Sequence, residues 1–259
     1  MQAVILAGGM GTRLAEETKS QPKPMVKIGS RPILWHIMRR YALYGVEDFV
    51  ICCGYKGHMV KEYFLDYHHA NTDIDIHMDT GEFSCRGQEV EDWHVTLAST
   101  GLHTLTAGRV LKIRPYVGGE FFLTYGDGVG DIDIDALAEC HRRSGKALTI
   151  TVTKPAGRFG AVELDEATGE VHGFREKARA DQFYVNAGFM LCSPRVFDFL
   201  GDGSEMLERG PFGRLVAAGE MNAYIHKGFW SPMDNTHDRE YLRECVETGR
   251  AVWLKKERP

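Results

Sequence analysis

Short apolar runs alternate with runs of helical periodicity along the first part of the chain. Strands are predicted where apolar residues run together or alternate with polar ones, and helices where they recur every three to four positions. The predicted strands are residues 2–7, 48–53, 73–78 and 147–152, and residues 120–128 are predicted to be a strand that ends in a turn. The predicted helices are residues 31–45, 58–67 and 133–145. Strands that alternate with helices indicate βαβ units and a mostly parallel sheet.

From about residue 154 the pattern becomes richer in strands. Residues 159–177 look like two strands around a polar turn, residues 184–193 and 221–234 are strand-like, and residues 235–249 form a closing helix. No linker, repeat or low-complexity tract interrupts the chain. We therefore predict one α/β domain over residues 1–259, with a mostly parallel, Rossmann-like central sheet flanked by helices. The first part covers about residues 1–153, and a smaller, β-rich part covers about residues 154–259.

Composition and charge narrow the class of protein. Of the 259 residues, 43% are hydrophobic, which is enough for a sizeable core. A net charge of −5 argues against a broad nucleic-acid or membrane surface, so neither partner is expected. The first residues lack the pattern of a signal peptide, and no run approaches the about 18 apolar residues of a membrane span.

The cysteines and histidines contain no familiar metal or redox motif. None of the six cysteines forms a C-x-x-C pair, so a reduced, cytoplasmic compartment is expected. His68 and His69 are adjacent, and neighbouring residues on a helix point in different directions. The pair is therefore expected to be solvated or partly buried, without a metal.

A glycine-rich loop follows the first predicted strand. In open α/β sheets, ligands bind beyond the carboxyl ends of the strands, and clustered backbone N–H groups favour phosphate. Gly8, Gly9 and Gly11 leave the backbone bare, and Arg13 adds a fork that matches phosphate oxygens. The order G-G-x-G-T-R is neither G-x-G-x-x-G nor a G-K-[S/T] loop. The alternative is a glycine turn that only fits a tight corner between strand and helix.

Lys23 lies between two prolines shortly after this loop. Pro22 and Pro24 stiffen the backbone on both sides of the lysine. A lysine held in this way can reach back over the glycine loop as a point charge for a triphosphate. The alternative is a solvated lysine in a rigid loop.

The stretches "LAGGMGTRL" and "PKPMVKIGSRPIL" together resemble the sugar-phosphate nucleotidyltransferases. The subgroup that uses CTP and glucose 1-phosphate is similar in further stretches, among them "DFVICCGYKG", "VKEYF", "FLTYGDGV", "GRFGAVEL" and "GFWSPMD". The resemblance implies transfer of a cytidylyl group from CTP to the sugar phosphate, with release of pyrophosphate and with Mg²⁺ as cofactor. It also implies a homo-oligomer, in which residues 1–153 bind the nucleotide and residues 154–259 the sugar.

The resemblance implies roles for particular residues of the nucleotide site. Arg13 and Lys23 would be catalytic, by neutralising phosphate charge. Thr100 and Gly101 would read a pyrimidine and Gly108 would admit its ring, while Thr106 has the alternative role of a helix cap. The full set implied to bind the nucleotide is Leu6, Ala7, Gly8, Gly9, Gly11, Thr12, Arg13, Lys23, Thr100, Gly101 and Gly108.

Two aspartates are implied as metal ligands. Asp127 follows a predicted buried strand, where an aspartate can hold a hard divalent cation through oxygen. Its alternative role is an Asp-Gly turn. Asp234 looks like the second carboxylate, with a helix N-cap as its alternative. If both lie at the carboxyl edge of the sheet, we expect them to share one Mg²⁺.

The sugar-phosphate residues implied by the resemblance are Gly160, Glu176, Lys177, Asn186 and Gly188. Two positions depart from the family pattern. Ala178 stands where the family's Glu-Lys-Pro motif has proline, and Ala187 where close relatives tend to have glycine. These departures leave the identity of the sugar open.

Three other functions remain at this point. The enzyme could use UTP or dTTP, or another sugar 1-phosphate. A catalytically silent sensor of nucleotide sugars could share the fold, although retention of Arg13, Lys23, Asp127, Lys177 and Asp234 together argues against it. An oxidoreductase that binds a dinucleotide is disfavoured by the glycine spacing.

Overall fold

A seven-stranded sheet forms the centre of the molecule in a computed structural model that describes residues 1–11, 14–87, 90–154, 161–164, 171–175 and 184–256. The strand order is β14-β10-β13-β8-β1-β4-β7. The strands are β1 (Gln2–Ala7), β4 (Asp48–Cys53), β7 (His94–Ser99), β8 (Phe121–Tyr125), β10 (Leu148–Thr153), β13 (Val185–Cys192) and β14 (Met221–His226). Only β13 runs antiparallel to its neighbours among these described strands, so the predicted mostly parallel α/β sheet is confirmed.

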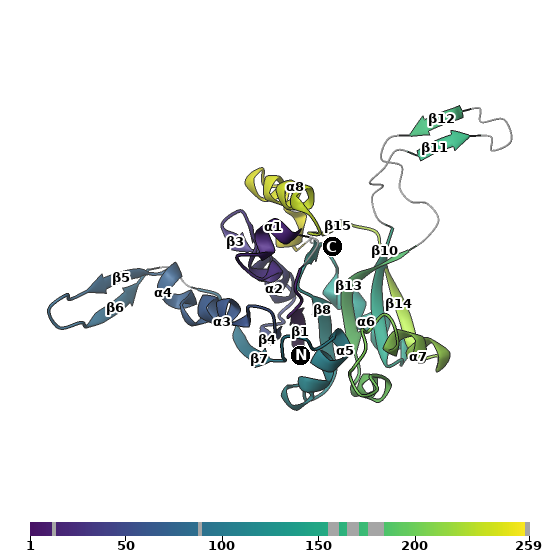
Figure 1. Cartoon of the computed structure of the whole chain (residues 1–259), viewed down its shortest axis with the longest axis horizontal. Helices are drawn as coiled ribbons and strands as arrows, with labels where there is room; N and C mark the ends of the chain where they lie inside the picture. Colours follow the sequence, from purple (N-terminus) through teal and green to yellow (C-terminus); the bar gives the residue numbers. More distant parts are fainter. Residues whose placement is uncertain (12–13, 88–89, 155–160, 165–170, 176–183, 257–259) are drawn as a thin grey trace.

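Helices flank the central sheet (Figure 1). The α-helices are α1 (Ala15–Thr18), α2 (Ile33–Ala42), α3 (Gly57–Leu65), α4 (Tyr67–Asn71), α5 (Thr106–Lys112), α6 (Ile134–Ser144), α7 (Pro211–Ala217) and α8 (Thr236–Glu247). The 3₁₀ helices are η2 (Lys23–Met25), η3 (Arg114–Tyr116), η4 (Pro194–Phe199) and η5 (Val252–Leu254). α6 begins where Asp133 accepts a hydrogen bond from the Ala136 N–H at 2.9 Å, and it ends at Gly145 with φ 61°.

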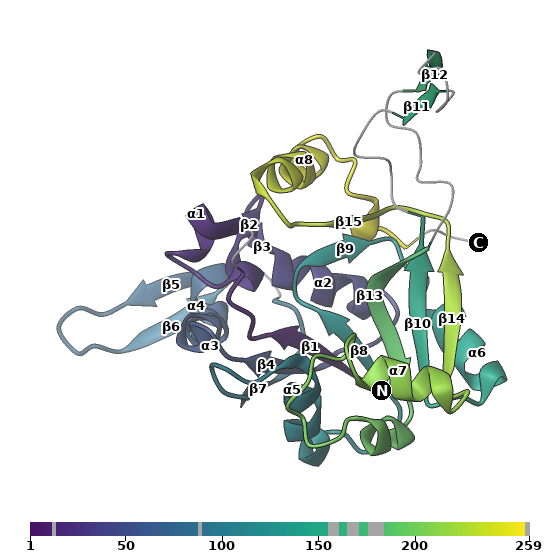
Figure 2. The same ribbon diagram turned by 45° about the vertical axis from the view of Figure 1, so that its right-hand side comes forward.

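Small antiparallel sheets surround the main one. They are β2 (Lys27–Ile28) with β3 (Arg31–Pro32), β5 (Asp73–Ile76) with β6 (Phe83–Arg86), β9 (Gly128–Gly130) with β15 (Trp230–Pro232), and β11 (Ala161–Leu164) with β12 (Val171–Arg175). The hairpin of β5 and β6 projects away from the body as an arm (Figure 1). β9 and β15 lie side by side between the central sheet and α8 (Figure 2).

Residues 221–234 were predicted as a single strand-like segment, and the structure differs from this prediction. The segment forms two strands, β14 in the central sheet and β15 in the separate pair with β9. The chain turns at Gly228, so β15 leaves the edge of the sheet and crosses to β9. There the Asp131 N–H donates to the Phe229 carbonyl at 3.1 Å. This crossing matters for the site, because Asp234 directly follows β15.

Apolar residues fill both faces of the sheet. Along β1, Ala3 and Ile5 belong to one buried cluster, while Val4 and Leu6 belong to the other. Side chains of a strand alternate between its faces, so a strand covered on both sides reads as one continuous apolar run. The buried core holds the carboxyl ends of β1 and β8 side by side at one edge of the sheet.

Candidate active site

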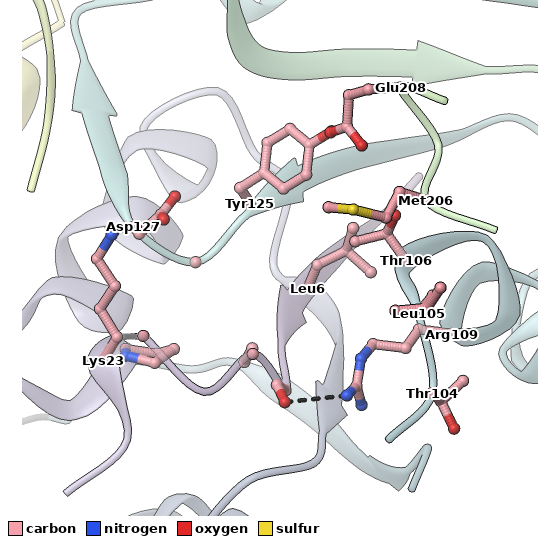
Figure 3. Close-up of a pocket in the computed structure, with 16 residues that line it drawn as sticks. Leu6, Lys23, Thr104, Leu105, Thr106, Arg109, Tyr125, Asp127, Met206 and Glu208 are labelled. Carbon is pink, nitrogen blue, oxygen red and sulfur yellow. Dashed lines mark hydrogen bonds and ion pairs between the residues drawn. The ribbon is translucent and has the colours of Figure 1, made fainter. Parts of the chain in front are cut away.

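A cavity of about 400 Å³ opens where β1 and β8 end (Figure 3). The two strands are parallel neighbours, and the chain leaves each of them into this space. Ligands of open α/β sheets bind at such an edge. The lining residues are Leu6, Ala7, Gly8, Gly9, Gly11, Lys23, Pro24, Thr104, Leu105, Thr106, Arg109, Tyr125, Gly126, Asp127, Met206 and Glu208.

The glycine loop is bare for two different reasons. At Gly8, a Cβ atom would lie 2.1 Å from Nη1 of Arg109, so the guanidinium occupies the space of a side chain. At Gly11, φ is +63°, a conformation that favours glycine, and a Cβ would lie 2.7 Å from Thr18. Among the described residues, and leaving out its two chain neighbours, Gly9 has no atom within 4 Å of where a Cβ would be. The loop therefore presents exposed backbone to the cavity.

Arg109 anchors the glycine loop through hydrogen bonds of its guanidinium. Its guanidinium donates to the Gly8 carbonyl at 2.9 Å and to Thr100 Oγ1 at 2.5 Å. Thr100 in turn donates to the Cys53 carbonyl at 2.8 Å. Burial lowers the pKa of Arg109, although a guanidinium stays protonated in proteins. The result is a buried positive charge at the wall of the cavity.

Lys23 lies between two carboxylates. Its side chain is 8% exposed, and Nζ donates to Asp127 Oδ2 at 2.8 Å and to Asp234 Oδ1 at 3.0 Å. The lysine begins η2, with Pro22 as the preceding residue and Pro24 within the first turn. Lys23 is therefore not a solvated lysine, which was the alternative that the sequence left open.

The pairing of β9 with β15 brings the two aspartates together. Asp127 precedes β9 and Asp234 follows β15, and in the antiparallel register Gly128 faces Pro232. The Met233 N–H donates to the Asp127 carbonyl at 2.8 Å, which closes the end of this pair. The cap of α8 is Asn235, whose side chain accepts from the Asp238 N–H. Asp234 therefore does not cap α8, and its carboxylate contacts Lys23.

Tyr125 and Glu208 form the wall of the cavity that faces the glycine loop (Figure 3). The tyrosine hydroxyl donates to the Glu208 carboxylate. Burial, with the adjacent Glu208 charge, raises the pKa of Tyr125 far above its usual value. The tyrosine is therefore neutral at physiological pH and keeps its proton as a donor.

Most residues of the predicted loop reach the cavity, but the predicted base-reading residues do not line it. Thr100 is fully buried beneath Arg109, and Gly101 borders a separate hollow beside Lys61. Gly108 packs against the backbone of Gly203, where a Cβ would lie 2.6 Å from the carbonyl oxygen. Its lack of a side chain serves the packing of α5 rather than the cavity.

Several residues that line the cavity were not predicted from the sequence. Thr106, for which the sequence offered a helix cap, also lines the cavity, but its Oγ1 accepts from the Leu207 N–H at 2.8 Å rather than capping α5. Arg109 carried a usable signal, because it is a cation on the buried face of a helix beside Ala107 and Val110. Among the cavity residues that were not predicted are Thr104, Leu105, Arg109, Tyr125, Met206 and Glu208.

The sugar-phosphate residues are only partly within the described chain. Asn186 and Gly188 lie on β13, where Asn186 Oδ1 accepts from the Gly188 N–H at 2.9 Å. Neither lines the cavity, although Gly188 packs against the Tyr125 ring. Outside the described residues lie Thr12, Arg13, Gly160, Glu176 and Lys177.

The cluster of carboxylates fits a hard divalent cation. Asp127 and Asp234 both contact the same Nζ, so their oxygens cannot be further apart than the sum of those two distances. The donors are oxygens from two carboxylates, of which that of Asp127 lines the cavity. Such a donor set suits Mg²⁺, which takes one or two protein carboxylates and completes its shell with water and phosphate oxygens.

The chain belongs to the nucleotidyl transferase family, whose model matches residues 2–231. It is similar to the glucose-1-phosphate cytidylyltransferase of Salmonella typhimurium, with 46% identity over 98% of each chain. It is also similar to mannose-1-phosphate guanylyltransferase 1 of Arabidopsis thaliana, at 30% identity over 98% of this chain and 65% of the relative.

A solved structure shares the fold. HddC from Yersinia pseudotuberculosis superposes with a TM-score of 0.64 at 20% identity, covering 95% of this chain and 99% of the other. Among the described helices, none has the length and apolar character needed to cross a membrane.

Proposed function

We propose that the protein transfers a cytidylyl group from CTP to α-D-glucose 1-phosphate, giving CDP-glucose and pyrophosphate. A phosphate oxygen of the sugar phosphate forms a bond to the α-phosphorus of CTP. The bond from that phosphorus to the bridging oxygen breaks, and pyrophosphate leaves with the electron pair. The observation that carries this proposal is the cluster of Lys23, Asp127 and Asp234 beside the bare glycine loop. Similarity to the Salmonella enzyme supports the choice of both substrates.

The glycine loop and its neighbours bind the triphosphate in this proposal. Backbone N–H groups of Gly8, Gly9 and Gly11 face phosphate oxygens, and Arg13 and Lys23 supply positive charge. Phosphoryl transfer of this kind depends on positioning and on charge stabilisation rather than on covalent participation of the protein. Lys23 is held against two carboxylates, so its ammonium is already oriented before substrate arrives.

Arg109 offers a way to select cytosine. Cytosine presents two adjacent acceptors, O2 and N3, whereas uracil carries a hydrogen on N3. Arg109 has five N–H donors, of which hydrogen bonds to Gly8, Thr100 and Leu102 use three. A guanidinium N–H that points at N3 donates a hydrogen bond to cytosine. In uracil the N3–H would face this N–H as a second donor, so no hydrogen bond forms. Arg109 therefore favours CTP over UTP in our proposal.

Asp127 and Asp234 would hold the proposed Mg²⁺. When bound, the ion neutralises charge on the phosphate oxygens.

The sugar phosphate is bound by Lys177, with Gly160, Glu176, Asn186 and Gly188 around it, as the family resemblance implies. Ala178 and Ala187 are the positions where the sugar site differs from the family pattern.

We also propose that the protein is a homo-oligomer that associates through the arm. Directly opposed residues of a hairpin share a face, and here Ile74 pairs with Cys85 and Ile76 with Phe83. Ile76 is 52% exposed and Phe83 57% exposed, so this face of the arm is apolar and remains half exposed, although the His69 ring contacts Phe83. A two-stranded hairpin is only marginally stable in water, and a second copy of the chain would cover this face.

The six unpaired thiols support a reducing, cytoplasmic location.

A panel of nucleoside triphosphates, assayed for pyrophosphate release with glucose 1-phosphate, tests the reaction. We expect CTP to give the highest kcat/KM, and mannose 1-phosphate to be a poorer acceptor. Preference for UTP or dTTP would overturn the choice of base. Tight binding of CTP without turnover would support the silent sensor and overturn the enzymatic function.

A further inference from the structure

Three side chains that commonly bind transition metals meet at the base of the arm, away from the cavity. His68 and His69 lie on α4, which leads into the arm, and Cys85 lies on β6 (Figure 1). One ligand atom from each residue lies within 4.8 Å of the other two. We propose that His68, His69 and Cys85 form a Zn²⁺ site that ties α4 to the arm.

The strand register explains why Cys85 faces α4. Cys85 is opposite Ile74, and Phe83, two residues earlier, points to the same face of the hairpin. The ring of His69 contacts the ring of Phe83 edge-on, with centroids 5.2 Å apart. α4 therefore covers the base of the face that carries the thiol.

The two adjacent histidines converge in spite of their backbone directions. Successive side chains on a helix are separated by about 100°, which led us to expect that this pair would diverge. α4 has only five residues, and the two rings stand 84° apart with centroids 6.1 Å from one another. Each imidazole is long enough to turn one nitrogen back toward Cys85.

Two imidazole nitrogens and a thiolate are a donor set for Zn²⁺ rather than for Mg²⁺ or Ca²⁺. In zinc sites the Zn–N and Zn–S bonds are about 2.0 and about 2.3 Å long, so the three donors must move closer together on binding. The two histidine side chains are exposed and can rotate to do so. Within the described part of the chain, none of the three donor atoms takes part in a hydrogen bond or ion pair. A water would complete the tetrahedron.

The charge around the site favours a cation. Residues 66–86 contain five acidic side chains and a single arginine. Such an excess of one sign attracts counter-ions. Binding exchanges the thiol proton for the S–Zn bond and releases that proton to solvent, so affinity rises with pH. The bound ion closes the chain between α4 and β6 and stabilises the arm.

Titration of the full, untagged chain with Co²⁺, after treatment with a chelator, tests the site. Co²⁺ reports a thiolate ligand through a sulfur-to-metal charge-transfer band, and Zn²⁺ is expected to displace it. We expect one equivalent to bind. Cys85→Ser should abolish the band, and His68→Asn and His69→Asn should each weaken binding about tenfold or more. Added Zn²⁺ should slow hydrogen exchange of the β5 and β6 amides.

Two matched variants control for adventitious binding. Cys140→Ser removes a half-buried thiol on α6, and His77→Asn removes a histidine between β5 and β6. Both should bind Co²⁺ as the wild type does, with unchanged circular dichroism in every variant. Absence of the charge-transfer band in the wild type would overturn the proposal. So would a Cys85→Ser variant that titrates like the wild type.

Discussion

Lys23 is a nearly buried ammonium whose charge is balanced by carboxylates from two distant parts of the chain. Breaking one partner of such a cluster leaves the others uncompensated. In the proposed reaction the same charge stabilises the phosphate oxygens. Single substitutions at Lys23 and Asp127 therefore test the charge cluster. A substitution at Arg109 tests the choice of base.

Lys23→Ala is expected to lower kcat/KM for CTP by about 100- to 1000-fold, comparable to the loss of one oxyanion donor. The melting temperature should also fall, because Asp127 and Asp234 both lose the ammonium that they contact. Steady-state assays and thermal melts measure the two effects. Lys27→Ala, on an exposed residue of β2, is the matched control. Wild-type turnover in Lys23→Ala would remove the lysine from the mechanism.

Asp127→Asn and Asp234→Asn are each expected to abolish most activity, because each removes a charged ligand of the proposed Mg²⁺. The concentration of Mg²⁺ needed for half-maximal rate should rise in any residual activity. Chelation should silence the wild type, and added Mg²⁺ should restore it. Asp135→Asn, on an exposed carboxylate of α6, should behave as the wild type does. Full activity without a divalent cation would contradict the site.

Arg109→Lys keeps a positive charge but loses the planar fork. We expect the preference for CTP over UTP to fall about 10- to 100-fold, the size of one bidentate base contact. Competition between the two nucleotides, with products separated by chromatography, measures the preference. A thermal melt checks the fold, because Arg109 also holds Gly8 and Thr100. An unchanged ratio would exclude Arg109 from base selection.

At the scale of elements, α2 joins the N-terminal half of the chain to its C-terminal end. Its residue His36 is buried, with Nε2 2.9 Å from the Ile28 carbonyl, while Nδ1 accepts from Trp253 Nε1 at 3.2 Å. This arrangement requires the neutral ring, with its proton on Nε2. Burial lowers the pKa of His36 to about 4.

The free energy of unfolding should therefore fall as the pH drops below 6.5. Between pH 6.5 and about 4 the unfolded chain binds a proton at His36 that the folded chain excludes, so acid favours unfolding. From pH 7.5 to 5 this group accounts for a loss of about 2 kcal/mol. Urea titrations at both pH values measure it.

His36→Gln should lose less stability over the same pH interval, because it cannot bind the proton. His237→Gln, on an exposed histidine of α8, should lose as much as the wild type. Equal pH dependence of the wild type and His36→Gln would show that His36 is not the group responsible.

At the scale of the molecule, the arm extends beyond the body (Figure 1). It leaves Ile76 and Phe83 more than half exposed. The opposite face of the hairpin is polar, with Arg86 paired to Asp75 at 2.9 Å. An amphipathic hairpin outside the core is typical of an interaction surface. Its two faces allow a matched pair of variants.

Ile76→Asp combined with Phe83→Asp is expected to shift the protein toward the 29.1 kDa monomer in light scattering after gel filtration. Two charges on the apolar face disfavour its burial against a second copy. Ser84→Asp places a charge on the opposite face and should leave the mass unchanged. A monomeric wild type, or a double variant with the wild-type mass, would contradict association through this face.

The sequence by itself determined the features that depend on neighbouring residues. Alternation of apolar runs with helical periods predicted the parallel sheet, and three glycines after a buried strand predicted the loop at its carboxyl end. The cap at Asp133 and the stop at Gly145 were also predictable, because both act within one turn of a helix.

Only the tertiary structure decided how distant residues meet. Lys23 and Asp234 are 211 positions apart, and they meet because β15 leaves the main sheet to pair with β9. Gly8 and Arg109 are 101 positions apart, and the guanidinium fills the space that a side chain at Gly8 would need. Local periodicity specifies which face of a strand or helix is buried. It does not specify which partner covers that face, because pairing depends on the edges and cavities that the whole fold leaves open.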